Sequence, residues 1–395
     1  MPVPTPFHPR TAALNTSYLW KDWSGFYAVR SFGTYLEREY HAFRQTAGVI
    51  DVTPLFKYDI RGPDAAAFLA RILVKDASRL GHGRVAYCCW CDERGKVVDD
   101  GTVWRFDDTR FRLTAAEPCY FWLERFSRGY DVSVADVTAA VGALSLQGPR
   151  SRDILESVAG GVAGLEFFRL AETWVAGLDA VVTRTGYTGD LGYEVWVSSD
   201  DALELWDALL EAGRPYGLLP CGLDAMDVTR VEAGFLMNGV DYFSAHHCLI
   251  ESRKSTPYEL ALGWTVNLDR EPFNGQAALR REKQAGPIRH FVGLSLDWDE
   301  YESLFEAHGL PPSVPPGAWR DPRPVYEPGG RQVGQATSGA WSPVLKQNLA
   351  LATVDRGFHK LGTELKLEVT AEYERKTVTA TVTRKPFFEP QRKRR

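Results

Sequence analysis

At 395 residues, the chain is too long for one ordinary hydrophobic core, so several domains are expected. Its 44% hydrophobic and 25% charged residues are typical of globular proteins, and the formal net charge of −5 excludes a broad basic surface for nucleic acid. No apolar stretch approaches the roughly 20 residues of a membrane span, and residues 1–10 lack the order of a signal peptide. We therefore expect a cytoplasmic protein without a nucleic-acid or membrane partner.

The N-terminal fifty residues are unusually aromatic, with Trp20, Trp23 and Tyr27 close together. These three side chains allow two interpretations. One is a hydrophobic lid or interface. The other is a cage that binds the methylated ammonium or sulfonium group of a substrate, because aromatic faces stabilise a cation by roughly 0.5–2 kcal/mol. The pattern alone leaves both interpretations open.

Three of the six cysteines, Cys88, Cys89 and Cys91, crowd into one strand-like segment. They cannot all find disulfide partners there, so reduced thiols are expected. Their spacing is not that of a zinc site, and no matching Cys/His pair follows. No metal site is expected.

The middle of the chain mixes helical and strand patterns. Residues 62–72 and 199–213 carry apolar side chains at helical spacing, whereas residues 180–184 and 193–197 alternate as strands do. Helices and strands do not follow the regular order of a doubly wound parallel sheet. The predicted fold class is therefore α+β, with mixed, mostly antiparallel sheets.

The last third of the chain has a different texture. After about residue 280, short β segments are separated by Pro and Gly, which predicts an all-β domain over residues 281–395 that follows a larger region over residues 1–280. The basic run from Arg392 to Arg395 is expected to be a solvated tail.

A predicted hairpin brings an acid close to a phenol. Two strand-like segments flank a turn at residues 92–95, and a turn centred there places Tyr87 directly opposite Asp100. Because side chains alternate along a strand, Tyr87 and Asp100 share one face while Asp99 points to the other. A carboxylate in the middle of a hairpin is costly unless solvent or a ligand reaches it. An ordinary solvated face is the alternative interpretation.

A second motif runs from Arg184 to Glu194 and contains three glycines, which predict a tight loop and not a dinucleotide fingerprint. In the strand that follows, Glu194 and Trp196 share one face. An acid beside a large aromatic ring resembles the wall of a heterocycle site, where a carboxylate accepts hydrogen bonds from ring N–H groups. The alternative is an ordinary glutamate on an edge strand.

A third motif spans residues 222–234 and has helical spacing. Arg230 lies on the same stripe as Leu223 and Met226, so its guanidinium points toward the packed side and needs a partner there. A structural salt bridge satisfies this requirement. Glu194 is one candidate partner, and binding of a ligand by both residues is another.

Taken together, these motifs resemble the glycine cleavage T-protein (aminomethyltransferase) family of folate-binding proteins. The resemblance covers nearly the whole chain, in an ordered series of segments: Ala47–Val52, Tyr87, Gly95–Asp100, Leu146–Pro149, Arg184–Glu194, Gly222–Gly234, Phe273–Gly275 and Thr337–Pro343.

The resemblance implies a three-lobed fold with a C-terminal β-barrel-like domain, in which about residues 52–138 are inserted as one lobe of two interleaved α+β lobes. It implies tetrahydrofolate as the cofactor and Asp100 as the catalytic acid near the reacting folate nitrogens. It also places Tyr87, Tyr187, Glu194 and Arg230 where the family holds folate. A carboxylate in such a position can stabilise developing positive charge and take or relay a proton.

Two departures from the family pattern bear on the substrate. The usual Asp-Val-Ser-His opening appears here as residues 51–54, Asp-Val-Thr-Pro, and the paired glycine before the catalytic strand appears as Gly95 and Lys96. The tail after Pro386 runs into basic residues in place of the family's tyrosine-bearing end. Glycine cleavage itself and docking of a lipoyl carrier protein are therefore left open.

Three functions follow from these observations. The leading hypothesis is a tetrahydrofolate-dependent one-carbon transferase that removes a methyl or methylene group from a small methylated amine or an aminomethyl donor. An O- or S-demethylase that yields 5-methyltetrahydrofolate is the enzymatic alternative. A non-catalytic folate-binding scaffold or iron–sulfur assembly factor is the third, although the Lys-Gly-Cys-Tyr-type motif of such relatives is not found.

Overall fold

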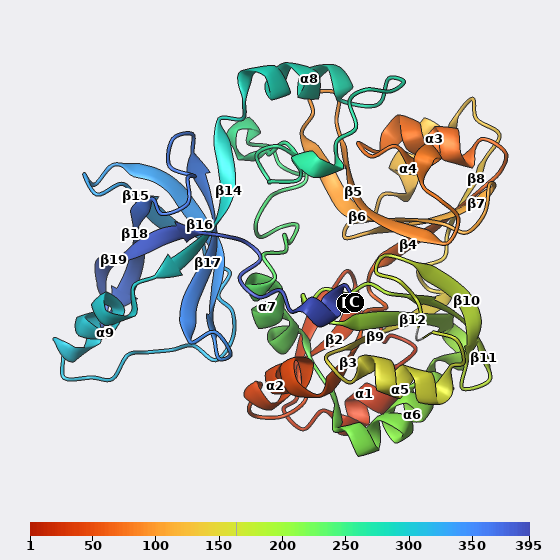
Figure 1. Ribbon diagram of the computed structural model, residues 1–395, viewed down its shortest axis with the longest axis horizontal. Coiled ribbons are helices and arrows are strands. Elements are labelled where there is room, and N and C mark those ends of the chain that lie inside the picture. Colours follow the sequence, from red (N-terminus) through yellow and green to blue (C-terminus); the bar gives the residue numbers. More distant parts are fainter. Residues whose placement is uncertain (163) are drawn as a thin grey trace.

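The computed structural model describes residues 1–162 and 164–395, and it arranges them in three lobes (Figure 1). Two lobes combine helices with mixed, mostly antiparallel sheets, and the third is a closed β-barrel. The predicted α+β fold with a C-terminal barrel is confirmed. None of the described helices has the length and apolar character needed to cross a membrane.

The first lobe is built on a six-stranded sheet with the order β10-β11-β12-β9-β3-β13. Its strands are β3 (Ala47–Asp51), β9 (Val141–Gln147), β10 (Leu170–Val175), β11 (Leu178–Thr183), β12 (Gly192–Ser198) and β13 (Leu218–Pro220). The helices α1 (His8–Leu14), α5 (Ser151–Val158) and α6 (Ala202–Gly213) pack with one face of it. That face carries Tyr193, Val195 and Val197, whereas Trp196 packs in a different cluster on the opposite face.

The second lobe is a five-stranded sheet with the order β5-β6-β7-β4-β8, covered by α3 (Ala65–Ile72) and α4 (Tyr120–Ser127). Its strands are β4 (Phe56–Arg61), β5 (Arg84–Cys91), β6 (Val97–Arg105), β7 (Arg110–Ala115) and β8 (Ser133–Asp136). All of them lie in the chain between β3 and β9, which are hydrogen-bonded neighbours in the first sheet.

The third lobe is a closed barrel with the order β14-β17-β16-β15-β18-β19. Its strands are β14 (Arg289–Leu296), β15 (Arg323–Tyr326), β16 (Gln332–Ser342), β17 (Gln347–Asp355), β18 (Glu364–Ala371) and β19 (Glu374–Thr383). Helix α8 (Gln276–Ala285) precedes the barrel, and α9 (Trp298–Glu306) lies against β19. Short 3₁₀ turns occur along the chain at Ala77–Arg79, Ser199–Asp201, Arg214–Tyr216, Glu251–Arg253, Gly263–Thr265 and Gln391–Lys393.

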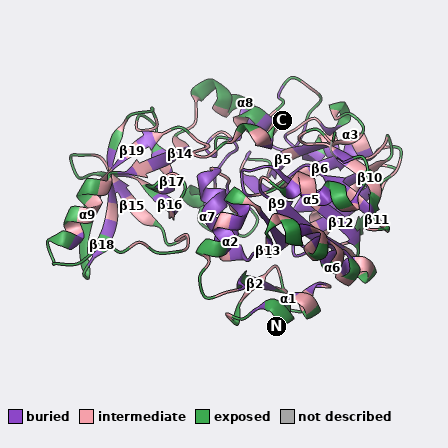
Figure 2. Ribbon diagram, turned by 60° about the horizontal axis from the view of Figure 1, so that its bottom comes forward, coloured by how far each residue is buried: buried purple, intermediate pink, exposed green. Residues whose placement is uncertain are grey.

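Helix α7 (Leu223–Glu232) lies at the centre of the molecule and is buried over almost its whole length (Figure 2). It packs against α2 (Glu37–Gln45), the barrel strands β16 and β17, and β2 (Phe26–Ser31), which forms a hairpin with β1 (Leu19–Trp23). Because α7 is buried all round, its charged side chains Asp227, Arg230 and Glu232 need partners from other elements.

The prediction of a solvated basic tail is wrong for Arg392 and Lys393, whereas Arg394 and Arg395 are exposed. The Arg392 guanidinium pairs with Asp190 at 2.7 Å, and Lys393 is buried with its ammonium over the Phe235 ring. The physical reason is Asp190, whose fully buried carboxylate is also approached by Arg44 at 3.6 Å. A buried carboxylate draws in cations that would otherwise be solvated.

Candidate functional site

The hairpin of β5 and β6 is shifted by two residues from the predicted register. Cys89 pairs with Asp100, and Tyr87 pairs with Thr102, so Tyr87 is not directly opposite Asp100. The predicted turn was too short, because the Asp92 carboxylate accepts the N–H groups of both Arg94 and Lys96 and so stabilises a longer turn. A bulge at Trp90 and Cys91, next to the turn, also shifts the register. A shift of two keeps the alternation of faces, so Tyr87 and Asp100 still share one face.

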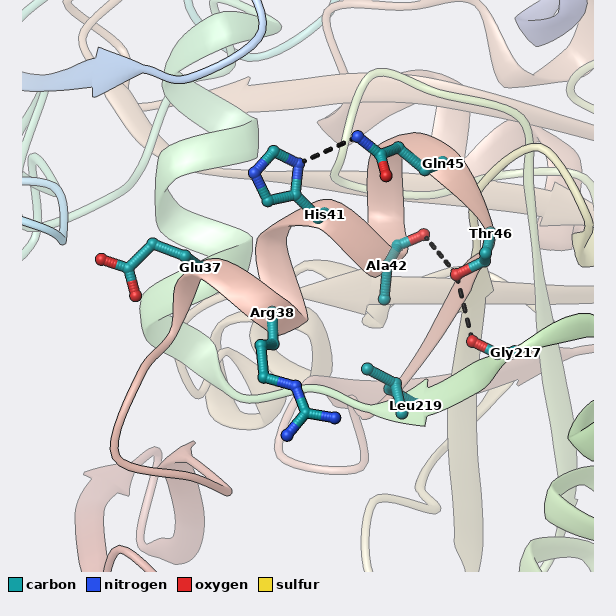
Figure 3. Close-up of a pocket in the computed structure, with 8 residues that line it drawn as sticks. All are labelled: Glu37, Arg38, His41, Ala42, Gln45, Thr46, Gly217 and Leu219. Carbon is teal, nitrogen blue, oxygen red and sulfur yellow. Dashed lines mark hydrogen bonds between the residues drawn. The ribbon is translucent and has the colours of Figure 1, made fainter.

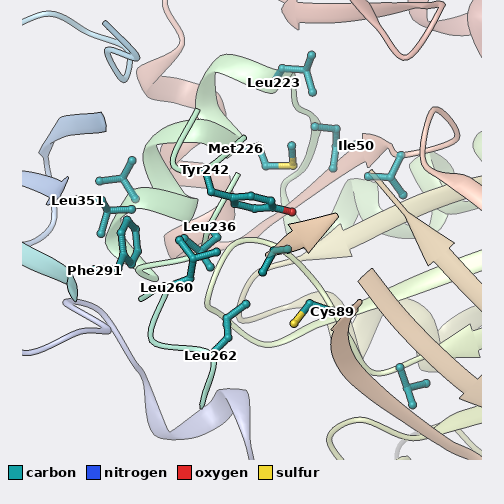
Figure 4. Close-up of a cluster of buried hydrophobic side chains, with 14 of the residues drawn as sticks. Ile50, Cys89, Leu223, Met226, Leu236, Tyr242, Leu260, Leu262, Phe291 and Leu351 are labelled. Atoms are coloured by element: carbon teal, nitrogen blue, oxygen red, sulfur yellow. The ribbon is translucent and has the colours of Figure 1, made fainter. Parts of the chain in front are cut away.

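Two tyrosine hydroxyls hold the Asp100 carboxylate. Tyr87 is its diagonal neighbour across the hairpin and donates a hydrogen bond of 2.7 Å to Oδ2. Tyr242 donates to Oδ1 from the opposite side. The Tyr242 ring lies in the buried cluster at the centre of the molecule, with Met226, Leu236 and Leu260 nearby (Figure 4).

Tyr242 reaches this carboxylate because the edge of β6 is open at that point. Strand β7 pairs with β6 only from Val103 onward, and beyond it the Ala245 N–H bonds the Val97 carbonyl. Gly101 of β6 lies where the end of β7 crosses over β6, since a Cβ at Gly101 would lie 1.9 Å from the Thr114 carbonyl oxygen. The segment that carries Tyr242 therefore contacts the end of β6 that β7 leaves unpaired.

Asp99 lies directly behind this arrangement and is fully buried. Its Oδ2 accepts the backbone N–H groups of Ala116 at 3.0 Å and Glu117 at 2.9 Å, and its Oδ1 accepts from Asn238 at 2.8 Å. The Tyr242 hydroxyl oxygen is 3.4 Å from the same Oδ1. Tyr242 thus lies between two adjacent carboxylates.

The two carboxylates have no cationic partner: among the described residues, no Lys, Arg or His forms a salt bridge with Asp99 or Asp100. Burial and the neighbouring Asp100 charge raise the pKa of Asp99 to about 8. Burial also raises the pKa of Asp100, although the hydroxyls of Tyr242 and Tyr87 oppose that shift. Two adjacent acids without a counterion favour a state that keeps one proton.

The faces that carry Asp100 and Glu194 meet where the first two lobes touch. Trp104, on the same face of β6 as Asp100, packs edge-on against Trp196 of β12 with ring centroids 4.9 Å apart. Glu194 is two residues from Trp196 and shares its face. Its carboxylate is half-buried, and Oε2 accepts from Thr185 at 2.6 Å.

Tyr187 joins this region through its ring. The ring stacks on Phe235 at 5.6 Å and 28°, and its hydroxyl donates to the Leu236 carbonyl. On the other side of Asp100, the Tyr87 ring is stacked at 6.1 Å and 24° with Trp264, which is 65% exposed. The side chains of Tyr87, Asp100, Tyr187 and Glu194 are all partly exposed, so solvent or a ligand can reach each of them.

Arg230 forms structural salt bridges, which was one of its predicted roles, but not with Glu194. Its side chain is fully buried, Nε bonds Asp227 and Nη1 bonds Asp241, each at 2.7 Å. Glu194 is not its partner, because the acids on and beside α7 neutralise it first. Its Nη2 has no hydrogen-bond partner among the described residues, so the folate contact of Arg230 stays a prediction.

The three N-terminal aromatic residues do not form one cage. Trp20 and Tyr27 pack edge-on at 6.2 Å, together with His8, whereas Trp23 packs against the central cluster. Trp20 and Trp23 are three residues apart on one strand, so they point to opposite faces. The interpretation as a hydrophobic lid or interface fits Trp23 better than the cage.

Four contributors to the site were missed by sequence reasoning: Asp99, Asn238, Tyr242 and Trp264. Asp99 was placed on the opposite face and left without a role. Asn238 and Tyr242 follow within ten residues of the helical motif that ends at Gly234, and this closeness was the one available signal. Trp264 lies in the short 3₁₀ turn Gly263–Thr265, which carries no periodic pattern.

A separate surface depression of about 550 Å³ lies over α2 and β13 (Figure 3). In it His41 contacts Gln45 at 3.3 Å, and Thr46 bonds the Gly217 carbonyl at 3.0 Å. None of its lining residues hydrogen-bonds Asp99, Asp100 or Tyr242 within the part of the chain that the structure describes. The chemistry of the candidate site therefore does not depend on this depression.

Comparison with known proteins agrees with this architecture. Residues 7–270 match the GCVT N-terminal domain, and residues 289–389 match the glycine cleavage T-protein C-terminal barrel domain. An aminomethyltransferase of Symbiobacterium thermophilum is 35% identical over 362 residues, covering 89% of this chain and 88% of that protein. A trimethylamine-oxide aldolase of Ruegeria pomeroyi is 32% identical over 405 residues, covering 99% of this chain but 47% of that protein.

Among solved structures, the glycine cleavage system aminomethyltransferase T from Bartonella henselae superimposes with a TM-score of 0.83 at 25% identity. The match covers 98% of this chain and 99% of that one. Sequence and structure thus agree from the first lobe through the barrel. This chain belongs to the glycine cleavage T-protein family of aminomethyltransferases.

Proposed function

We propose that this chain is a tetrahydrofolate-dependent transferase that removes a methyl or methylene group from a small methylated amine or an aminomethyl donor. The observation that carries the proposal is the Asp100 carboxylate, which is partly exposed, is held by the hydroxyls of Tyr87 and Tyr242, and has no cationic partner in the described part of the chain. An acid in this setting attracts a cationic nitrogen and can exchange a proton with it.

The residues around Asp100 fit a reduced pterin. Oε2 of Glu194 accepts hydrogen bonds from Thr183 and Thr185, while Oε1 accepts none from the described residues and is open to ring N–H donors. The rings of Tyr187 and of the Tyr87–Trp264 stack offer apolar faces for an aromatic ligand. We infer that Tyr87, Tyr187, Glu194 and Trp264 hold tetrahydrofolate, and that Arg230 holds the segment around Asp241 through its two salt bridges.

When bound, tetrahydrofolate supplies the nitrogen nucleophiles that accept the one-carbon unit. The chain's own contribution is to hold a negative charge at Asp100 beside the site where positive charge develops. The Tyr87 and Tyr242 hydroxyls keep that carboxylate in place by donating to its two oxygens. Exchange of a proton at Asp100 then assists departure of the amine.

The relatives support a methylated nitrogen donor. One matched protein is named an aminomethyltransferase and another a trimethylamine-oxide aldolase, and both names refer to a carbon attached to nitrogen. A cationic methylated amine complements a site that contains two acids and several aromatic rings. No observation favours the O- or S-demethylase or the scaffold, and we propose neither.

We expect the enzyme to act in the cytoplasm, and its six cysteines are free thiols in the structure.

The test is a substrate panel. The protein is incubated with tetrahydrofolate and, separately, with methylated glycines, trimethylamine oxide, betaines, sulfonium compounds and methoxy-aromatic compounds, and the folate product is identified by mass. We expect methylene- or methyltetrahydrofolate with N-methyl donors only. Turnover with sulfonium or methoxy compounds alone contradicts the proposed donor. Folate binding without turnover of any donor contradicts the enzymatic proposal and favours the scaffold.

A further inference from the structure

Asp99 and Asp100 are connected through the Tyr242 hydroxyl. The hydrogen bonds of this hydroxyl indicate the direction in which a proton can pass between the two acids. Tyr242 has one hydroxyl proton, and the shorter of its two carboxylate contacts assigns that proton to Asp100. A lone pair of the same oxygen is then left toward Oδ1 of Asp99, 3.4 Å away. The other oxygen of Asp99, Oδ2, is already occupied by two backbone N–H donors.

A proton on Asp99 therefore has one well-defined place, Oδ1, from which it faces the Tyr242 oxygen. With that proton present, the chain runs from Asp99 to Tyr242 to Asp100, and each hydroxyl points to the next oxygen. Without it, one buried and one half-buried carboxylate face a single hydroxyl proton, and no cation among the described residues pairs with either. The protonated arrangement is the better satisfied of the two.

We propose that Asp99 stores a proton which it shares with Asp100 through the Tyr242 hydroxyl. The use of this proton rests on the proposed function, but its presence on the buried pair does not. Asp100 is the catalytic residue in this scheme, because it faces the site. Tyr242 and Asp99 act through it and are positioning residues.

The proton movement balances in three coordinated steps. The Tyr242 proton moves to the Asp100 carboxylate while the Asp99 proton moves to the Tyr242 oxygen. The new O–H bond of Asp100 then breaks as its proton passes to the departing amine, which leaves Asp99 and Asp100 both ionised. When Asp100 takes a proton from the attacking nucleophile, the same movements run in reverse and restore the proton on Asp99.

The direction of the pH dependence follows from this scheme. The protonated pair is the active form, so the rate is constant at low pH and falls as the pH rises through the pKa of Asp99, about 8. The titratable groups that face the pair are phenols, thiols and one further acid: Tyr87, Tyr187, Tyr242, Cys88, Cys89, Cys119 and Asp241. The charge of Asp241 is neutralised by Arg230.

The experiment compares the wild type with Tyr242→Phe and Asp99→Asn. Phenylalanine keeps the packed ring and removes the hydroxyl. Asparagine at position 99 meets donors on both sides, so its folding is checked by its melting temperature. Tyr40→Phe is the matched control, since it also deletes a buried hydroxyl that donates to a carboxylate, Glu232. Infrared spectra of protein labelled with ¹³C at the aspartate carboxyl groups report protonated aspartate without any ligand.

We expect the wild type and Tyr40→Phe to share a carboxylic acid band that disappears as the pH rises through about 8. Asp99→Asn lacks this component, and Tyr242→Phe shifts its titration because the two acids are no longer coupled. In turnover, Tyr242→Phe reduces kcat by roughly 10²-fold and moves the alkaline limb of the pH profile, within the usual range for proton-transfer groups.

Two results overturn the proposal. If the wild type and Asp99→Asn give the same aspartate band at every pH, no proton is stored on Asp99, whether or not the protein transfers one-carbon units. If Tyr242→Phe lowers kcat but leaves both the band and the pH profile unchanged, Tyr242 only orients Asp100. Absence of turnover with every donor, together with the expected bands, contradicts the proposed function and leaves the shared proton standing.

Discussion

Two buried clusters of carboxylates lie near the centre of this molecule and differ in how their charge is balanced. On α7, each of the two buried acids has an arginine: Glu232 pairs with Arg44 at 2.5 Å, and Asp227 with Arg320 at 2.6 Å. Asp99 and Asp100 are also buried or half-buried, yet their partners among the described residues are hydroxyl, amide and backbone N–H donors.

This difference distinguishes a cluster that stabilises the fold from a cluster that can take part in a reaction. Arg44 and Glu232 come from elements far apart in the chain, so their pairing connects the first lobe to α7. The two charges neutralise each other. The acids of the hairpin keep an unbalanced charge that a proton or a cationic ligand must satisfy. Four substitutions test this distinction.

The largest expected effect is at Asp100. Asp100→Asn keeps the shape of the side chain and an acceptor for one tyrosine hydroxyl, but it removes the charge and the exchangeable proton. We expect turnover of the best N-methyl donor to fall by about 10²- to 10⁴-fold, with little change in folate affinity or melting temperature. Product formation by mass and folate titration measure the two effects. Unchanged turnover contradicts the role of the unbalanced acid.

The balanced cluster is broken by Arg44→Met. The substitution leaves Glu232 and Asp190 without one of their cations in a buried setting, which costs about 3–5 kcal/mol of unfolding free energy. Denaturant unfolding measures this loss. Arg150→Met, which removes an exposed pair with Asp153, is the control and should leave the midpoint unchanged. A small effect at Arg44 contradicts the structural role of the cluster.

Gly101→Ala connects stability with the site. The new methyl group meets the Thr114 carbonyl, which is backbone and cannot turn away, so we expect a loss of about 1–3 kcal/mol. The displaced segment also carries the N–H donors of Asp99, so turnover should fall further than stability predicts. Gly33→Ala, with open space around its Cβ, is the control. Equal behaviour of the two variants contradicts the crossing described at β6.

The smallest expected effect belongs to an exposed ring outside both clusters. Trp264→Ala removes the partner of Tyr87 at the solvent side, and we expect roughly tenfold weaker tetrahydrofolate binding, or about 1.4 kcal/mol. The melting temperature should not change, because Trp264 is 65% exposed. Isothermal titration measures the affinity. An unaltered Kd removes Trp264 from the proposed folate site.

Alternation of side chains was the reliable part of the sequence analysis. It placed Tyr87 with Asp100, and Glu194 with Trp196, on their correct faces, because a period of two survives a shift of two residues. The register itself was wrong, since a side-chain-stabilised turn and a bulge leave no periodic signal. Series of motifs also identified the barrel and the family correctly.

Partner choice among buried charges was not predictable. Helical spacing showed that Arg230 points inward, but the acids that bind it include Asp241, from an irregular segment that only tertiary structure brings close. Tyr242 was missed for the same reason. Long-range pairing in loops depends on where the whole chain passes, and local patterns do not contain that information.

The strands of the second sheet lie in the chain between β3 and β9 of the first sheet. This order has a consequence for synthesis on the ribosome. Strand β3 must wait for β9, its neighbour from beyond the whole five-stranded sheet, before it can complete its hydrogen bonds. The intervening sheet uses only residues that emerge before β9, so it can form as a unit while β3 is still unpaired. Nascent chains that stop before β9 therefore expose the edge of β3. In such intermediates, binding by chaperones competes with misfolding.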